Sequence, residues 1–304
     1  MQSVRKLRIT LLFILIALIA LVSLSIFSYM QMRIINSAET ELSSEEELTV
    51  LIYHHLAPED ASDWIFEDNE AVITEEQFSE QMEALYELDY ETLSSDDVRD
   101  FVLGEKDIPE RSVVITFDDG YESNYQFAYP LLKEYEHQAI FFPIISRMEE
   151  NESSFDPEVL TYMSWSQLKE MKRADVAEVQ HHTYDSHDYA EVNDSGDERP
   201  EFAGPIWLED EERMETEEEF RQRVYDDIKK GQKLLESKTG KPASVLAYPF
   251  GWGSEEAAEE ASRLGIEIAF GPEGDRIQPG DNIWNLSRIN VSPDWNLEDF
   301  VEAL

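Results

Sequence analysis

The sequence predicts an α/β protein: an irregular (β/α) barrel of about seven parallel strands, preceded by one N-terminal transmembrane helix. Short, nearly continuous apolar runs alternate with longer segments of helical periodicity, which is typical of a parallel sheet covered by helices. Polar and charged residues directly follow several of these runs, as at the functional end of a barrel. A long apolar stretch near the N-terminus predicts the transmembrane helix. An open, doubly wound sheet is the alternative architecture.

Residues 9–30 form the apolar stretch, which carries no charge and follows Arg5, Lys6 and Arg8. About 20 apolar residues match the hydrocarbon core of a bilayer, which is about 30 Å thick. A cleaved signal peptide is the alternative, but its apolar core is usually only about 7–15 residues long. Basic residues before the stretch and acidic residues after it place the rest of the chain outside the cytoplasm.

We therefore expect three parts: a cytoplasmic stub with a membrane anchor over residues 1–36, an acidic linker over 37–47 and one domain over 48–304. The domain is expected to be extracellular and tethered to the cell membrane, or secreted if the first part is cleaved.

Composition excludes several classes of partner and site. The chain has 67 acidic and 24 basic residues and a formal net charge of -43, so it would repel the phosphates of a nucleic acid. It has no cysteine, which rules out disulfides and thiolate metal ligands. With 42% hydrophobic residues it can still bury a sizeable core.

Strands are expected where short apolar runs, several of them rich in β-branched residues, end in polar or turn-forming residues. These runs cover residues 48–53, 112–117, 139–145, 176–180, 245–248 and 266–270.

Helices are expected where a capping residue precedes an apolar stripe of helical spacing. The capped starts are Thr74 with Gln77, Ser164 with Gln167, and Thr216 with Glu219; further helices are expected over 127–135 and 254–264. Residues 188–213 form an acidic excursion in which Pro200, Gly204 and Pro205 break any element. This excursion is either part of a groove wall or a solvated loop.

Two adjacent carboxylates, Asp118 and Asp119, follow the strand that ends at Phe117. Buried carboxylates are costly unless a cation compensates them. Alternation along a strand directs neighbouring side chains differently, so one carboxylate can bind a metal while the other transfers a proton. The alternative is a plain acidic turn, because Asp-Gly is a common turn pair.

Five of the six histidines lie in two places, and both places follow predicted strands. His54 and His55 form the first group, and His181, His182 and His187 form the second. The carboxyl ends of parallel strands meet at one edge, where barrels and doubly wound sheets build their sites. Two histidines and one carboxylate leave positions open on a divalent metal, which is the catalytic arrangement.

These residues resemble the motifs of a known family. Thr116 to Tyr121 resembles the first motif of the polysaccharide deacetylases (the NodB-homology group, carbohydrate esterase family four), and His182 to His187 resembles the second. The segments Tyr53-His54-His55-Leu56 and Ala247-Tyr248-Pro249-Phe250-Gly251 are similar to the branch that deacetylates poly-β-1,6-N-acetyl-D-glucosamine, the intercellular adhesin of biofilms. The resemblance covers residues 48 to about 300.

The resemblance implies a metal site built from Asp119, His182 and His187, with Asp118 as the general base. It places the general acid at His54 rather than His55, because the family's Tyr-His pair aligns with Tyr53-His54.

The resemblance also assigns residues around the substrate. The backbone N–H of Tyr121 would stabilise the oxyanion. The third motif usually begins with Arg-Pro, whereas this chain has Tyr248-Pro249, so the function of that arginine is either absent or supplied from elsewhere, and Arg288 is our candidate for it. Tyr248 itself is a candidate for binding substrate. Trp252, which lies between two glycines, is the best candidate for stacking on a sugar. Tyr184, Trp207, Phe250 and Trp295 are positioned either for stacking or for core packing.

The implied activity is hydrolysis of N-acetyl groups by a divalent ion, with zinc the expected metal and nickel, cobalt or iron as alternatives. The implied substrate is poly-β-1,6-N-acetyl-D-glucosamine. Two alternatives remain: a deacetylase of peptidoglycan or chitin, and an inactive protein that binds polysaccharide.

Overall fold

The protein is described by a computed structural model, which covers residues 47–304 apart from residues 60, 62–70, 151–153 and 158. The chain divides into two units, Met1–Leu42 and Ser43–Leu304. The predicted membrane span over residues 9–30 lies outside the described residues. Within the described part of the chain, no helix is both long enough and apolar enough to cross a membrane.

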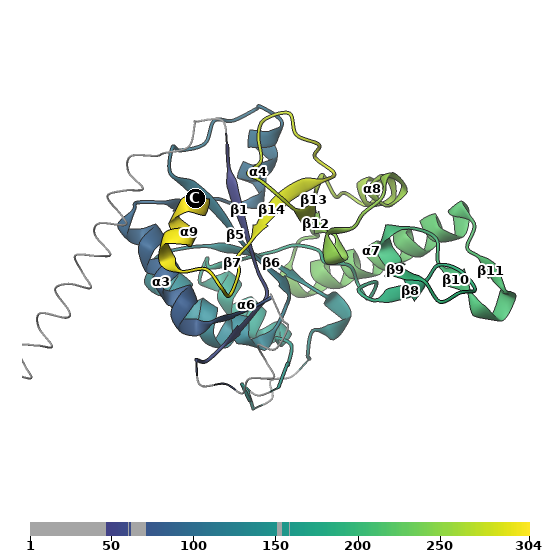
Figure 1. The fold of residues 1–304 in the computed structure, drawn as a ribbon, viewed down its shortest axis with the longest axis horizontal. Helices are drawn as coiled ribbons and strands as arrows, with labels where there is room; N and C mark the ends of the chain where they lie inside the picture. The colour runs from purple at the N-terminus through teal and green to yellow at the C-terminus, as the bar shows by residue number, and fades with distance from the viewer. Residues whose placement is uncertain (1–46, 60, 62–70, 151–153, 158) are drawn as a thin grey trace, which may run out of the picture. The chain divides into compact units, whose positions relative to one another are not determined.

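A parallel sheet forms the centre of the second unit (Figure 1), in the order β12-β13-β14-β1-β5-β6-β7, and β4 pairs with β5 off this path. The strands are β1 (Thr49–Tyr53), β4 (Glu91–Thr92), β5 (Ser112–Asp119), β6 (Ala139–Pro143), β7 (Ala177–Val179), β12 (Val245–Ala247), β13 (Ile268–Glu273) and β14 (Leu286–Asn290). A bridge between His181 and Leu246 joins the two ends of the sheet. This arrangement agrees with the predicted (β/α) barrel.

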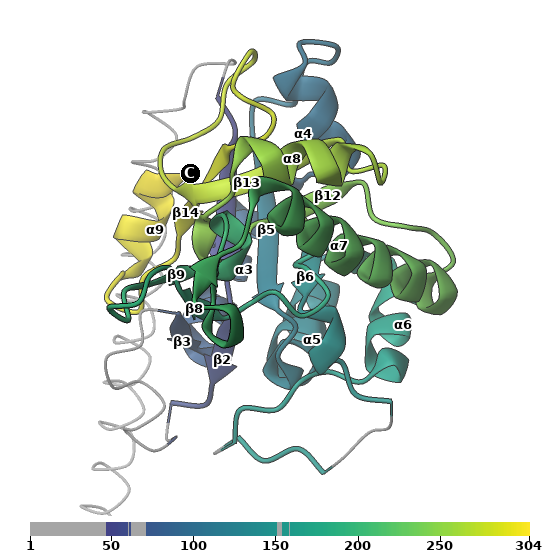
Figure 2. The ribbon, with the colours of Figure 1, turned by 90° about the vertical axis from the view of Figure 1, so that its right-hand side faces the viewer.

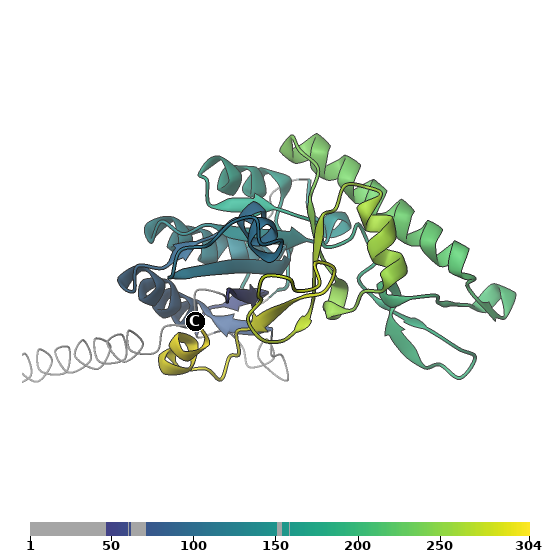
Figure 3. The same ribbon diagram turned by 90° about the horizontal axis from the view of Figure 1, so that it is seen from above.

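The helices lie around the outside of the strands (Figures 2 and 3). They are α3 (Glu75–Glu87), α4 (Ser95–Val102), α5 (Tyr129–Glu134), α6 (Trp165–Arg173), α7 (Glu217–Thr239), α8 (Glu255–Ser262) and α9 (Leu297–Ala303). The predicted caps at Thr74, Ser164 and Thr216 are confirmed as N-caps. Gln77 does not complete its predicted capping box, because its amide donates to the carbonyl oxygens of Ser292 and Trp295 instead.

Short elements connect these parts. β2 (His55–Ala57) pairs with β3 (Val72–Thr74), and a π-helical turn, η1 (Asn124–Ala128), precedes α5. Short 3-10 turns are η2 (Ile145–Arg147), η3 (Glu201–Ala203), η4 (Glu209–Glu211) and η5 (Pro249–Gly251).

The prediction that residues 188–213 contain no element is wrong. This excursion forms two antiparallel hairpins beside α7 (Figure 1), β8 (Tyr189–Glu191) with β9 (Glu198–Pro200), and β10 (Trp207–Leu208) with β11 (Arg213–Met214). Strands of two or three residues are too short to show periodicity in a sequence. Arg223 of α7 anchors the excursion by ion-pairing with Glu215 and donating to the carbonyl oxygens of Glu201 and Gly204.

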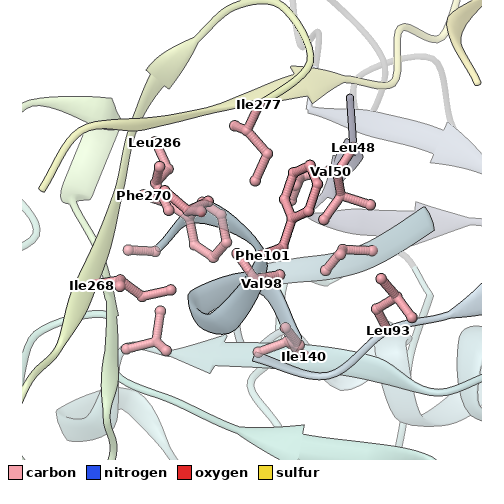
Figure 4. Close-up of a cluster of buried hydrophobic side chains, with 14 of the residues drawn as sticks. Leu48, Val50, Leu93, Val98, Phe101, Ile140, Ile268, Phe270, Ile277 and Leu286 are labelled. Atoms are coloured by element: carbon pink, nitrogen blue, oxygen red, sulfur yellow. The ribbon is translucent and has the colours of Figure 1, made fainter. Parts of the chain in front are cut away.

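Apolar side chains fill the end of the barrel at which the strands begin (Figure 4). Val98 and Phe101 of α4 pack there against side chains from several strands. Inward positions recur at every second residue of a strand, so the same row of β5 contains buried Val114 near its start and Asp118 near its end. The packed core therefore lies below a polar layer at the carboxyl ends of the strands.

Candidate active site

A cavity of about 370 Å³ opens at the carboxyl ends of the strands. It is lined by Ile52, His54, Ala71, Asp118, Asp119, His182, His187, Phe250, Gly251, Gly271, Glu273, Arg288 and Asn290. Seven residues singled out in the sequence thus meet in one place, although they come from segments that are more than 200 residues apart. Parallel pairing of β14, β1 and β5 brings these segments together.

Asp118 and Asp119 both line this cavity, although strict alternation would direct them to opposite faces of the strand. The reason is a local change of backbone conformation: Asp119 has φ 66 and Gly120 has φ 82, so the chain leaves the strand geometry at this point. A side chain at Gly120 would clash with Pro143, because a Cβ would lie 2.8 Å from the Cβ of Pro143. Left-handed backbone at a non-glycine residue is a strained conformation that is common at functional sites.

Arg288 holds Asp118 in a two-point ion pair. Its Nη1 and Nη2 donate to Oδ1 and Oδ2 of Asp118 over 2.8 Å and 2.7 Å, and its Nη1 also donates to the hydroxyl of Thr116. The guanidinium lies over the rings of Phe142 and Phe270. Burial alone would raise the pKa of Asp118, but Arg288 together with His182 and His54 outweighs burial and lowers it, so the carboxylate stays ionised.

Asp119, His182 and His187 form the tightest cluster of possible metal ligands in the described part of the chain, with all ligand atoms within 4.8 Å of one another. Oδ1 of Asp119 lies 3.2 Å from Nε2 of His187 and 3.5 Å from Nε2 of His182. Burial would raise the pKa of Asp119, but the imidazoles of His182, His187 and His54 together outweigh it and hold the pKa well below its usual range.

The hydrogen bonding of His182 fits a bound cation. Its Nδ1 lies 2.8 Å from the carbonyl oxygen of Ala247, and a carbonyl can only accept, so Nδ1 carries a hydrogen. Burial would lower the pKa of His182, but the carboxylates of Asp118 and Asp119 outweigh it and raise the pKa in the protein alone. A ring that binds a metal must be neutral, and its Nε2 then presents a lone pair toward Oδ1 of Asp119, which has no hydrogen-bond partner among the described residues. Two facing acceptors repel each other unless a cation lies between them, and a backbone carbonyl behind a ligating histidine is a common support for a metal site.

Asp227 of α7 holds the loop between the two histidines, and the sequence did not reveal this role. Its carboxylate accepts hydrogen bonds from the backbone N–H groups of Tyr184, Asp185 and Ser186 over 2.8, 2.9 and 3.2 Å. These bonds bring His187 back toward His182. Asp227 lies on a helix with many other acidic residues, so no sequence signal distinguished it.

His54 projects into the cavity from the chain just after β1. Its Nδ1 is buried without a hydrogen-bond partner among the described residues, and its carbonyl oxygen accepts from the amide of Asn124 over 2.6 Å. Burial lowers the pKa of His54, and the carboxylates of Asp119 and Asp118 oppose that effect only in part.

The other predicted binding residues do not line the cavity. Tyr121 stacks on Tyr162, and Tyr248 is buried with its ring near Phe202. Trp252 is 62% exposed and directly follows cavity-lining Gly251. Their contacts with substrate stay predictions.

Among the aromatic candidates, Phe250 does line the cavity. It packs against His187 and against Tyr189 of β8, with ring centroids 4.5 Å and 4.7 Å apart. Phe250 and Tyr189 are 43% and 51% exposed, so the two rings form an apolar ledge beside the cavity. This contact places one end of the acidic excursion at the rim of the cavity.

A parallel barrel whose strand ends bring two aspartates and three histidines together in one open cavity defines the class: an α/β barrel with a donor set suited to a divalent metal. The sequence profile of the polysaccharide deacetylases matches residues 105–269, more than half of the chain. The chain belongs to the polysaccharide deacetylase family.

Individual relatives support this assignment. The chain is 27% identical over 261 residues to the poly-beta-1,6-N-acetyl-D-glucosamine N-deacetylase of Escherichia coli (strain K12), over 84% of this chain but only 38% of that relative. It is 28% identical over 225 residues to the enzyme of the same name from Staphylococcus aureus (strain MRSA252), over 73% of this chain and 68% of the relative.

Among solved structures, a de-N-acetylase from Aggregatibacter actinomycetemcomitans superposes with a TM-score of 0.71 at 23% identity. The match covers 85% of this chain and 100% of that one. At this identity, the similarity supports the fold.

Proposed function

We propose that this protein is a metal-dependent hydrolase that removes N-acetyl groups from poly-β-1,6-N-acetyl-D-glucosamine, giving acetate and free glucosamine units. The observation that carries the proposal is the convergence of Asp118, Asp119, His182, His187 and His54 on one cavity. The names of the relatives from Escherichia coli and Staphylococcus aureus support the choice of polymer.

Asp119, His182 and His187 would hold the metal, and the donor set of one carboxylate and two imidazoles suits zinc, with nickel, cobalt or iron as alternatives. When bound, a divalent ion supplies Lewis-acid chemistry that lowers the pKa of water and polarises the acetyl carbonyl.

The two proton transfers fall to different side chains. Asp118 is kept ionised by Arg288, so it can accept a proton from the attacking water. His54 reaches the same cavity from β1, and in its protonated form it can donate to the departing sugar amine. In this proposal, Arg288 serves in place of the arginine of the third motif.

The apolar ledge of Phe250 and Tyr189 supports a polymeric carbohydrate as the substrate, because aromatic rings beside a cavity provide flat faces for sugar rings. We further propose that the domain works outside the cytoplasm, tethered by the apolar stretch over residues 9–30, in the modification of biofilm exopolysaccharide.

The test is acetate release from this polymer by the full-length chain, with zinc, with a chelator, and after Asp119→Ala. We expect zinc-dependent release that the chelator and the substitution abolish. Release from chitin oligomers or peptidoglycan alone would keep the mechanism but replace the substrate. Binding of polymer without any release, with or without metal, would show an inactive polysaccharide-binding protein.

A further inference from the structure

Glu273 is a carboxylate at the rim of the active-site cavity that the reaction does not use. It is the last residue of β13, its side chain is exposed, and it lines the cavity together with Arg288 and Asn290 of β14. No cationic side chain pairs with it within the described residues. No pattern in the sequence distinguishes Glu273, because a glutamate in so acidic a chain carries no signal by itself.

The backbone around Glu273 is held firmly. Glu273 pairs in register with Arg288, and the next residue, Gly274, donates its N–H to the carbonyl oxygen of Arg288 over 3.0 Å. On the other side, Gly251 packs so closely that a Cβ there would lie 2.8 Å from the Cα of Pro272. The backbone of Glu273 is therefore fixed at the end of β13, between the η5 turn and β14.

The charges in the cavity make Glu273 distinct from the other two carboxylates. Asp118 is compensated by Arg288, and Asp119 faces His182 and His187. Among the residues that the structure describes, no cation is paired with Glu273, so it remains a negative charge at the mouth of the cavity. An uncompensated anion at the rim of a cavity attracts cations from solution and disfavours anions.

The proposed reaction generates such a cation. Each turnover converts a neutral acetamido group into an amine, which is protonated near neutral pH. In a polymer, the newly formed ammonium stays on the same chain as the remaining acetylated units, next to the unit that enters the cavity.

We propose that Glu273 forms a subsite for the ammonium group of a free-amine hexosamine unit adjacent to the unit being deacetylated. This inference rests on the proposed function and goes beyond it. Glu273 then makes partly deacetylated polymer a better substrate than fully acetylated polymer, so deacetylation continues near units that have already reacted.

A carboxylate can also accept hydrogen bonds from the hydroxyl groups of any sugar. Hydrogen bonding to hydroxyl groups would favour acetylated and partly deacetylated chains equally, and a glutamine at position 273 would largely retain it. Binding of an ammonium group requires the negative charge of glutamate.

The experiment compares two defined β-1,6-linked N-acetylglucosamine oligomers of equal length, one fully acetylated and one with a single free amine. We expect the full-length protein to show a kcat/KM about three- to fivefold higher for the amine-containing oligomer, the size expected of one solvent-accessible ion pair. The ratio should fall toward one as salt is added, because ions screen an exposed pair. Glu273→Gln should bring the ratio to about one at low salt, and Glu273→Lys should invert it.

Glu302→Gln is the matched control, because it removes the same charge from α9, away from the cavity-lining residues, and it should keep the preference. A ratio of one in the unaltered protein, or a preference that survives Glu273→Gln, would overturn the subsite while leaving the deacetylase intact. Absence of acetate from both oligomers would overturn the proposed function and this inference with it.

Discussion

The chain contains two His-His pairs, His54-His55 and His181-His182, and the structure uses them in the same way. In each pair one ring lines the cavity and its neighbour is buried elsewhere. His55 contacts the hydroxyl of Ser123 through Nδ1 over 2.9 Å, and His181 contacts the carbonyl oxygen of Ile228 through Nε2 over 3.2 Å. Two identical dipeptides thus each contain one site residue and one packing residue.

The difference within each pair follows from its place at the end of a strand, where successive side chains point in opposite directions. Burial lowers the pKa of His55 to about 4 and that of His181 to about 3, so both packing rings are neutral near pH 7. His181 also lies tightly against α7, since a Cβ on Gly231 would be 2.2 Å from its Nε2. A histidine at the edge of a site is therefore not automatically part of the chemistry.

The largest expected effect on activity distinguishes the two histidines of the second pair, His181 and His182. His182→Ala should abolish acetate release and weaken zinc binding, because it removes a ligand, and the loss should exceed the about 10²–10⁴-fold that general acid–base catalysis contributes. His181→Gln should retain zinc binding and lower the melting temperature instead. Acetate release and zinc titration check both variants. A folded His181→Gln protein without zinc binding would contradict the comparison.

The next largest effect distinguishes the two histidines of the first pair, His54 and His55. His54→Ala should lower kcat by about 10²–10⁴-fold, because a general acid is lost, while zinc affinity stays the same. Stopped assays of acetate release, with zinc titration in parallel, measure both quantities, and His55→Gln is the matched control. Full activity in His54→Ala would move the general acid to another residue.

The smallest effect concerns acid stability. The pKa of His55 is lowered from its usual 6.5 to about 4 in the folded chain. Between these values the unfolded chain binds more protons, so His55 makes the free energy of unfolding decrease as pH falls from 6.5 toward 4, by about 3 kcal/mol in total. His55→Gln keeps a hydrogen-bond partner for Ser123 but cannot titrate. The free energy of unfolding of this variant should therefore depend less on pH between 6.5 and 4. Denaturant unfolding in chelator at several pH values measures it, and parallel curves for the two proteins would refute the role.

Much of the fold could be predicted because its signals are local. The N-caps at Thr74, Ser164 and Thr216 were correct, since a capping side chain bonds within its own turn. Helix α4 was missed, although Ser94 and Asp97 form a capping box at its start. The hairpins of the excursion were missed because their strands have only two or three residues. Strand β14 has five residues and was missed because Ser287 and Arg288 interrupt its apolar run.

The sequence by itself determined the parallel α/β class, the edge of the sheet that bears the site, and the grouping of Asp118, Asp119, His54, His182 and His187, because strands and the polar residues after them are adjacent in the chain. Only the tertiary structure decided that Arg288 pairs with Asp118, that Asp227 holds the histidine loop, and that Glu273 lies at the cavity rim. These relationships join segments about 40 to 170 residues apart. They depend on how strands and helices pack, and no local pattern in the chain encodes that packing.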